Sequence, residues 1–244
     1  MADPTTVAGL NAWFKADAIT GLVDGDPVAT WPESQSAANA TQGTAAKKPV
    51  YKTAQVNSLP AVRFDGVDDV MTSTASSSLT ATTVFVVAKV TAATVGRALR
   101  GAGNDGGLEF RINATDFQQV VRQNVADVSS STSTVTEDAW QSWTTSFANA
   151  STYAFYAGGT ANGTGTHAVT LTAAQTTALG AGLTGGAGFD FMVGDIAEII
   201  VYDSVLSAGD RATVHTYIQD KYGITVSDYA GAPRVTYQHA VQIG

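Results

Sequence analysis

Short strand-like segments separated by turn residues recur along most of this 244-residue chain. Residues 83–90 are almost all apolar, as expected of a strand buried on both faces, whereas residues 108–112 alternate between an apolar and a charged face. Strands are also expected at residues 61–64, 118–122, 140–147, 152–157, 166–171, 178–183 and 195–202. Many short strands joined by Gly- and Asn-rich turns predict a sandwich or jelly roll, and not an alternating α/β sheet. The Ser/Thr-rich stretches 72–78 and 129–136 are expected to be surface loops.

One segment, residues 207–223, has the pattern of a helix instead. Ser207 can act as the N-cap, Asp210 lies three residues on in a capping-box position, and Gly223 is placed to end the helix. One face of the segment is an apolar stripe edged by charge, formed by Arg211, Val214, Tyr217, Ile218, Lys221 and Tyr222. The sequence therefore predicts a single helix near the C-terminus that lies against a sheet.

Residues 226–244 follow this helix as a tail outside the expected domain, which covers residues 1–225. Residues 234–243 of the tail alternate as in a strand, with one face formed by Val235, Tyr237, His239, Val241 and Ile243. Such a strand can pair with an edge of its own sandwich, or it can add to a sheet of a neighbouring subunit. The second alternative makes the tail a candidate docking segment.

Charge and residue usage exclude several classes of function. The chain has no cysteine, which excludes zinc–thiolate sites, iron–sulfur clusters and cysteine nucleophiles. Its 13 Lys and Arg against 21 Asp and Glu give a net charge of -8, which argues against nucleic-acid and membrane partners. Residues 1–6 show no secretory signal, and the longest apolar runs are too short to span a bilayer.

Three local sequences, in a fixed order, carry a resemblance to a known family. Residues 9–17 (GLNAWFKAD) and 24–31 (DGDPVATW) are similar to that family's opening strand and first turn. Residues 59–69 (LPAVRFDGVDD) are similar to the start of its hairpin, and residues 194–203 (GDIAEIIVYD) to its closing strand before the helix. Together they resemble the concanavalin A-like, laminin-G-like jelly-roll domains of many phage and bacterial surface proteins. The resemblance implies an all-β jelly-roll sandwich of two antiparallel sheets with one C-terminal helix.

The resemblance does not carry a function, because this architecture serves lectins, adhesion modules, glycoside hydrolases and structural domains alike. Hydrolases of this superfamily carry a Glu-x-Asp-x-x-Glu run, which presents its carboxylates on one face of a strand. No such run occurs here, and the only glutamates are Glu33, Glu109, Glu137 and Glu198. Glu198 is expected at the surface or rim of its strand. We therefore expect no catalytic residues and no enzymatic activity.

The remaining chemical motifs are interpreted as structural. His167, His215 and His239 are isolated in sequence and lack the close spacing of metal-binding pairs. Residues 101–106 and 180–185 match Gly-x-Gly-x-x-Gly, but each lies between expected strands and not between a strand and a helix. Tryptophans could stack on sugars. The chain has four of them, Trp13, Trp31, Trp140 and Trp143, and a core position is expected for three. The sequons indicate only polar turns, at Asn39, Asn113, Asn149 and Asn162.

The turn at residues 65–69 is a candidate calcium site. Asp65, Asp68 and Asp69 place carboxylates on a tight turn, where they can supply the oxygen ligands that Ca²⁺ prefers. The family resemblance implies the same, since laminin-G-like domains often hold calcium. The alternative is a turn in which the Asp65 side chain bonds backbone N–H groups. No other metal or cofactor is expected, and the sequence names no ligand-binding residues.

These observations favour a non-enzymatic surface protein of a bacteriophage virion, either decorating the capsid or sitting on a fibre. It would be made in the host cytoplasm and would bind capsid or fibre subunits through the tail. Binding of host or environmental glycans through the sandwich loops is a further expectation, and a homo-oligomer is possible. The alternative is a bacterial carbohydrate-binding, lectin-like module, and a glycoside hydrolase is the least favoured.

Overall fold

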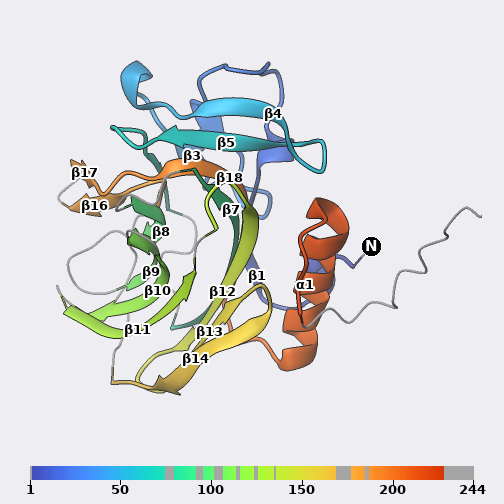
Figure 1. Cartoon of the computed structure of the whole chain (residues 1–244), viewed down its shortest axis with the longest axis vertical. Helices are drawn as coiled ribbons and strands as arrows, with labels where there is room; N and C mark the ends of the chain where they lie inside the picture. The colour runs from blue at the N-terminus through green and yellow to red at the C-terminus, as the bar shows by residue number, and fades with distance from the viewer. Residues whose placement is uncertain are drawn as a thin grey trace, which may run out of the picture.

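The computed structural model describes residues 2–74, 80–91, 96–101, 107–113, 116–123, 126–134, 136–168, 177–184 and 187–227. Within these ranges two large antiparallel sheets lie face to face, and one helix packs on the outer face of the first sheet (Figure 1). We call the sheet beneath the helix sheet A and the opposite sheet B. This is the two-sheet sandwich with a C-terminal helix that the sequence predicts.

Sheet A is built around β18 (Val193–Tyr202). One side of β18 pairs with β7 (Ala81–Val90). The other side pairs first with β5 (Leu59–Asp65) and then with β1 (Leu10–Lys15). The sheet continues with β4 (Val50–Val56) beyond β5, and with β12 (Trp140–Ala148), β13 (Thr152–Ala157) and β14 (Thr160–Thr166) beyond β7.

Sheet B, like sheet A, has eight strands within the described residues, and smaller elements surround the sandwich. In spatial order its strands are β11 (Ala126–Thr134), β10 (Asp116–Gln123), β9 (Gly107–Asn113), β8 (Gly96–Gly101), β15 (Thr177–Leu179), β6 (Met71–Ser73), β3 (Ala40–Thr41) and β2 (Thr30–Trp31). The smaller elements are the β16–β17 hairpin (Gly182–Thr184 and Ala187–Phe189) and the 3-10 helices η1 (Pro4–Thr6), η2 (Ala16–Ala18) and η3 (Ala45–Lys47).

The main core lies between the two sheets. Sheet A contributes side chains such as Phe64, Val86 and Trp143, and sheet B contributes Trp31, Met71, Phe110 and Ile112. The alternating pattern of residues 108–112 is confirmed where side chains are described, because Phe110 and Ile112 face this core. The arrangement buries most large apolar side chains in one layer, which the sequence alternation requires.

The helix α1 (Ala208–Tyr222) begins and ends as its sequence predicts. The Ser207 side chain accepts a hydrogen bond from the Asp210 backbone N–H at 3.1 Å, and Gly223 ends the helix in the left-handed region with φ 70°. The buried face of α1 packs in a second core against Trp13, Phe85 and Ile200 on the outer face of sheet A. No helix in the described ranges is both long and apolar enough to cross a membrane.

Several polar strands differ from the sequence expectation. Residues 129–134, expected in a surface loop, belong to β11, and residues 72–73 of the other expected loop belong to β6. Residues 160–166 form β14. Of the strand expected at 166–171, residue 166 is the last of β14, residues 167–168 are not in a strand, and 169–171 lie outside the described residues. Strands β11 and β14 lie at sheet edges, where backbone hydrogen bonds to a single neighbour form without an apolar side-chain pattern.

The segment expected as one strand at residues 178–183 is divided at Gly180. Gly180 has φ 81°, and a Cβ atom there would lie 2.0 Å from the Phe64 ring. The chain therefore turns between β15 and β16 at a position that only glycine can occupy. This turn also accounts for the second Gly-x-Gly-x-x-Gly match, which is followed by a hairpin and not by a helix.

Candidate functional site

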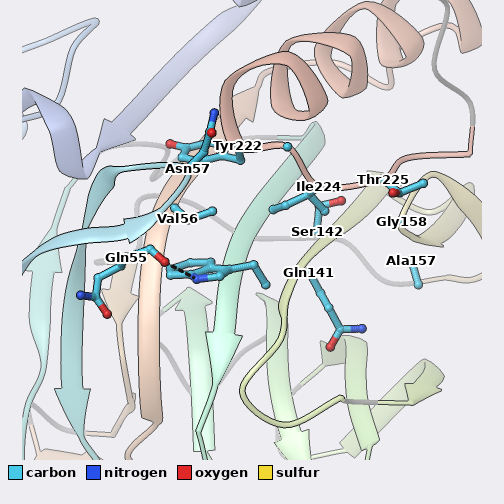
Figure 2. Close-up of a pocket in the computed structure, with 12 residues that line it drawn as sticks. Gln55, Val56, Asn57, Gln141, Ser142, Ala157, Gly158, Tyr222, Ile224 and Thr225 are labelled. Atoms are coloured by element: carbon cyan, nitrogen blue, oxygen red, sulfur yellow. Dashed lines mark hydrogen bonds between the residues drawn. The ribbon is translucent and has the colours of Figure 1, made fainter. Parts of the chain in front are cut away.

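An open groove of about 630 Å³ lies where the C-terminal end of α1 meets the outer face of sheet A (Figure 2). Four separate segments form its walls: the β4–β5 hairpin, the start of β12, the β13–β14 turn, and the end of α1 with the residues after it. The lining residues are Gln55, Val56, Asn57, Trp140, Gln141, Ser142, Ala157, Gly158, Tyr222, Gly223, Ile224 and Thr225.

Two hydrogen bonds join the β4–β5 hairpin to other walls of the groove. The Trp140 indole Nε1 donates to the Gln55 carbonyl at 3.0 Å, which ties β12 to the β4–β5 hairpin across sheet A. The Asn57 side chain donates from Nδ2 to the Lys221 carbonyl at 2.7 Å, and so satisfies one of the free carbonyls at the end of α1. Asn57 itself has φ 45°, a left-handed conformation that asparagine tolerates in tight hairpin turns.

Backbone hydrogen bonds close the opposite side of the groove. The Gly158 N–H donates to the Ser142 carbonyl at 2.9 Å, and the Ser227 N–H donates to the Gly158 carbonyl at 2.8 Å. The Val226 N–H donates to the Gln219 side chain at 3.0 Å, which fastens the residues after the helix to the helix. Each wall is therefore bonded to a neighbouring wall, and the groove is preformed without a ligand.

The groove presents the partly exposed ring of Trp140 and an edge of the buried Tyr222, together with uncharged hydrogen-bonding groups. Its lining residues include two glutamines, an asparagine, a serine and a threonine, but no carboxylate and no cationic side chain. The buried Ser142 Oγ has no hydrogen-bond partner among the described residues, although most buried polar groups in proteins have one. An aromatic ring beside amides and hydroxyls can bind a polyhydroxylated molecule through its apolar ring faces and its hydroxyl groups.

A second hollow of about 470 Å³ lies on the other side of the Asn57–Lys221 hydrogen bond. It is lined by Lys15, Asp17, Asn57, Leu59, Tyr217, Asp220 and Lys221. Beneath it lies Glu198, which its sequence pattern predicts at the surface or rim of its strand. That expectation is wrong, because the Glu198 side chain is fully buried between β18 and α1.

Glu198 is buried because it receives a full set of donors. The Trp13 indole N–H and the Tyr222 hydroxyl donate to it, the Tyr217 hydroxyl donates at 2.9 Å, and the Lys221 ammonium lies 2.9 Å from Oε2. Burial and the Glu198 charge raise the pKa of Tyr217 and Tyr222 far above the ordinary value, so both hydroxyls stay protonated as donors. This carboxylate, which receives donors from β1 and α1, fastens α1 to sheet A.

The turn at residues 65–69 has the predicted local geometry. The Asp65 carboxylate accepts the Val67 N–H at 2.8 Å, and Asp69 accepts the Asp65 N–H at 3.0 Å. Oxygen atoms of Asp65, Asp68 and Asp69 lie within 4.8 Å of one another. Burial raises the pKa of the Asp69 carboxyl to about 6. The structure thus shows the backbone-bonded turn, and calcium binding there stays a prediction.

The other residues singled out from the sequence are mostly structural. Trp13, Trp31 and Trp143 are buried as expected, whereas Trp140 is partly exposed and lines the groove. His215 is buried, with Nε2 2.8 Å from Thr144 Oγ1, and His167 stacks on Phe147. His239 and the rest of the strand-patterned tail lie outside the described residues.

The sequence did not reveal the groove because four separate segments contribute to it. The groove uses backbone groups of Gln55 and Gly158 and the side-chain amide of Asn57. No local sequence motif marks such contacts. The available signals were weak: Asn57-Ser58 between two strand-like runs indicates a hairpin turn, and Trp140 begins a strand in an otherwise polar stretch.

Comparisons of sequence find no matching family model and no matching curated protein. The structure, in contrast, is similar to the binding domain of botulinum neurotoxin serotype D, with a TM-score of 0.62 and 10% identity over 85% of this chain. It is similarly close to botulinum neurotoxin type C, which depends on interaction with two ganglioside molecules to enter cells (TM-score 0.61, 11% identity, 86% of this chain). This chain spans 50% and 51% of those two structures.

A third similar structure is the heptameric SAP-like pentraxin of Limulus polyphemus. It matches with a TM-score of 0.50 and 16% identity, and the match covers 60% of this chain and 77% of the pentraxin. At these identities the comparisons bear on the fold alone. The fold is thus a lectin-like jelly-roll β-sandwich with one C-terminal helix, as the sequence predicts.

Proposed function

We propose that this protein is a non-catalytic carbohydrate-binding module, and that it binds sugar in the groove beside Trp140. The observation that carries the proposal is the lining of the groove: the partly exposed Trp140 ring lies among amides and hydroxyls, and the walls are held in place by their own hydrogen bonds. Preformed walls lower the ordering cost of binding. That the structurally similar botulinum neurotoxin type C depends on interaction with two ganglioside molecules for cell entry supports the same class of ligand.

The arrangement of carboxylates supports binding and not hydrolysis. Glycoside hydrolysis requires two carboxyl groups on either side of the scissile bond. No carboxylate lines the groove, and Glu198 is saturated by donors beneath α1. Glu33 is likewise buried and accepts from the Trp13 N–H at 2.6 Å and the Gln35 N–H at 2.8 Å.

Replacing Trp140 tests the proposal. Glycan-array screening followed by titration calorimetry is expected to find sugar binding to the wild type, and Trp140→Ala is expected to weaken it by at least about 10-fold, because central aromatic contacts dominate such interfaces. Trp140→Phe keeps a ring and is expected to retain more affinity. Circular dichroism shows whether each variant is folded. Folded Trp140→Ala protein that binds as tightly as the wild type would place the site elsewhere.

We further propose that the protein acts on the surface of a bacteriophage virion, as a capsid decoration protein or as part of a fibre. The resemblance of the three sequence blocks to phage-encoded jelly-roll domains supports this setting, as does a strand-patterned tail that follows the closing helix. The alternative, a free bacterial lectin-like module, is supported equally by the groove. Co-purification with phage particles favours the virion role, and sugar binding by protein found only free in solution favours the alternative.

A further inference from the structure

A row of polar side chains crosses the outer face of sheet A next to the groove. Trp140 on β12 lies opposite Lys89 on β7, Lys89 lies opposite Asp195 on β18, and Asp195 lies opposite Arg63 on β5. Directly opposed residues in antiparallel strands project from the same face. The four side chains therefore form a continuous line on the face that carries α1, beginning at the aromatic ring of the groove.

The charges in this row do not cancel. Arg63 binds Asp195 through Nε at 2.6 Å and Nη2 at 2.9 Å, and the Lys89 ammonium lies 3.1 Å from the same carboxylate. Two cations thus share one anion, which leaves one net positive charge. The Asp195 side chain is fully buried, whereas the side chains of Arg63 and Lys89 are 38% and 16% exposed. A molecule in solution meets the cations and not the carboxylate.

One residue connects the charged row to the groove. The Gln55 side chain accepts from Arg63 Nη2 at 2.9 Å, while the Gln55 carbonyl accepts from the Trp140 indole at 3.0 Å. On the other side, the Lys89 ammonium lies 5.8 Å from the centre of the Trp140 ring. Figure 2 shows Gln55 at the edge of the groove, with the dashed hydrogen bond leading from its carbonyl. The ring and the cations are therefore close enough for one small ligand to contact both.

We propose that the sugar bound at this groove is an acidic one, with its ring on Trp140 and its carboxylate on Lys89 and Arg63. This inference rests on the proposed carbohydrate function and names the ligand class. A single carboxylate matches the single unbalanced charge, and charge-assisted hydrogen bonds to guanidinium and ammonium groups are stronger than neutral ones. Because Asp195 holds both cations in place, little side-chain entropy is lost when the ligand binds.

Matched pairs of oligosaccharides test this inference on the full chain. One pair ends in glucuronic acid or in glucose, and a second consists of sialylated lactose and lactose, so that the two sources of a sugar carboxylate are separated. Calorimetry is expected to show at least about 10-fold tighter binding of the acidic member of a pair, since a hydrogen bond to a charged group contributes about 2 kcal/mol. High salt is expected to reduce this preference.

Variants of Lys89 test whether its ammonium group causes the preference for acidic sugars. Lys89→Gln is expected to lower the ratio of acidic to neutral affinity by about 10-fold, and Lys89→Arg is expected to keep it. Lys52→Gln is the matched control, because it removes the same charge from β4 at the edge of the same sheet, where Lys52 pairs with Asp24 outside the groove. If Lys89→Gln does not fold, the salt dependence of the wild type and the Lys89→Arg variant still provide the test.

The possible outcomes distinguish a failure of the acidic-sugar preference from a failure of carbohydrate binding itself. Equal binding of acidic and neutral members that depends on Trp140 overturns the acidic preference and leaves carbohydrate binding standing. A sulfated lactose bound in place of both carboxylated sugars also overturns it. Binding of no sugar at all overturns the proposed function itself.

Discussion

Asp69 is a buried carboxyl group whose environment opposes its ionisation. Its side chain lies beside the carboxylates of Asp65 and Asp68, and burial raises its pKa to about 6 from an ordinary value of 3.8. Because the folded-state pKa is the higher one, protonation stabilises the fold. That stability is fully present below about pH 4 and is lost as the pH rises through about 6.

Asp69→Asn removes this titration and keeps an oxygen that can accept the Asp65 N–H. The quantity compared is the free energy of unfolding of the variant minus that of the wild type. It is expected to be about 2 kcal/mol larger at pH 8 than at pH 4.5, because the pKa of Asp69 differs by about two units between the folded and unfolded states. Urea denaturation at the two pH values measures the difference. Asp68→Asn, which removes a neighbouring charge from the same turn, is expected to change it less. A difference that does not vary with pH would contradict the prediction.

Single residues also show where the sequence was informative. The caps Ser207 and Gly223 were predictable because each is read from local geometry alone. Glu198 was not, because its burial depends on Trp13, Tyr217, Lys221 and Tyr222, which come from other elements. An isolated glutamate within an apolar strand carries no local sign of its partners.

At the scale of elements, the docking of α1 on sheet A depends on this buried carboxylate. Glu198→Gln leaves the Lys221 ammonium and two tyrosine hydroxyls facing an uncharged amide. Among the described residues Lys221 then keeps one charged partner, Asp17, at 3.0 Å. Loss of one member of a buried pair is expected to lower the free energy of unfolding by about 3 kcal/mol. Chemical denaturation measures this loss.

The exposed residue Glu137 provides the control for the same exchange. Glu137→Gln is expected to change the stability by less than about 0.5 kcal/mol, as for most surface substitutions. An equal effect of the two variants would show that Glu198 does not fasten the helix.

The strands fall into two groups, those with an apolar or alternating sequence pattern and those with a polar sequence. β7, β18 and the described part of β9 have apolar or alternating patterns, and all were predicted. β11 and β14 are polar, and they were missed because edge strands need only one neighbour to satisfy their backbone groups. Tertiary pairing, and not local preference, determines such strands.

At the scale of the whole molecule, the described part of the chain ends at Ser227, which is bonded to the β13–β14 turn. The hydrogen bonds from Ser227 to Gly158 close the groove before residue 228. A chain that lacks residues 228–244 is therefore expected to keep the unfolding temperature of the full chain and to lose incorporation into phage particles, measured by sedimentation with particles. A tail of scrambled sequence and equal composition is the control. Normal incorporation of the shortened chain would contradict docking through the tail.

The groove could not be predicted because its parts meet only in the finished fold. Residues near 55, 140, 158 and 224 are distant in sequence and contribute one or two groups each. The sandwich itself was predictable, since period-two alternation and turn residues occur within each segment. Patterns inside a segment are visible in a sequence, whereas a surface assembled from four segments is not.

The pairing of β1 with β18 has a kinetic consequence. Residues 10–15 reach their partners only when residues 198–202 have been made, so sheet A stays open along one edge of β5 and β7 for most of the synthesis of the chain. Contacts of such long sequence separation make folding slow. The growing chain must therefore keep the apolar strand β7 from pairing with other copies until its own closing strand emerges from the ribosome.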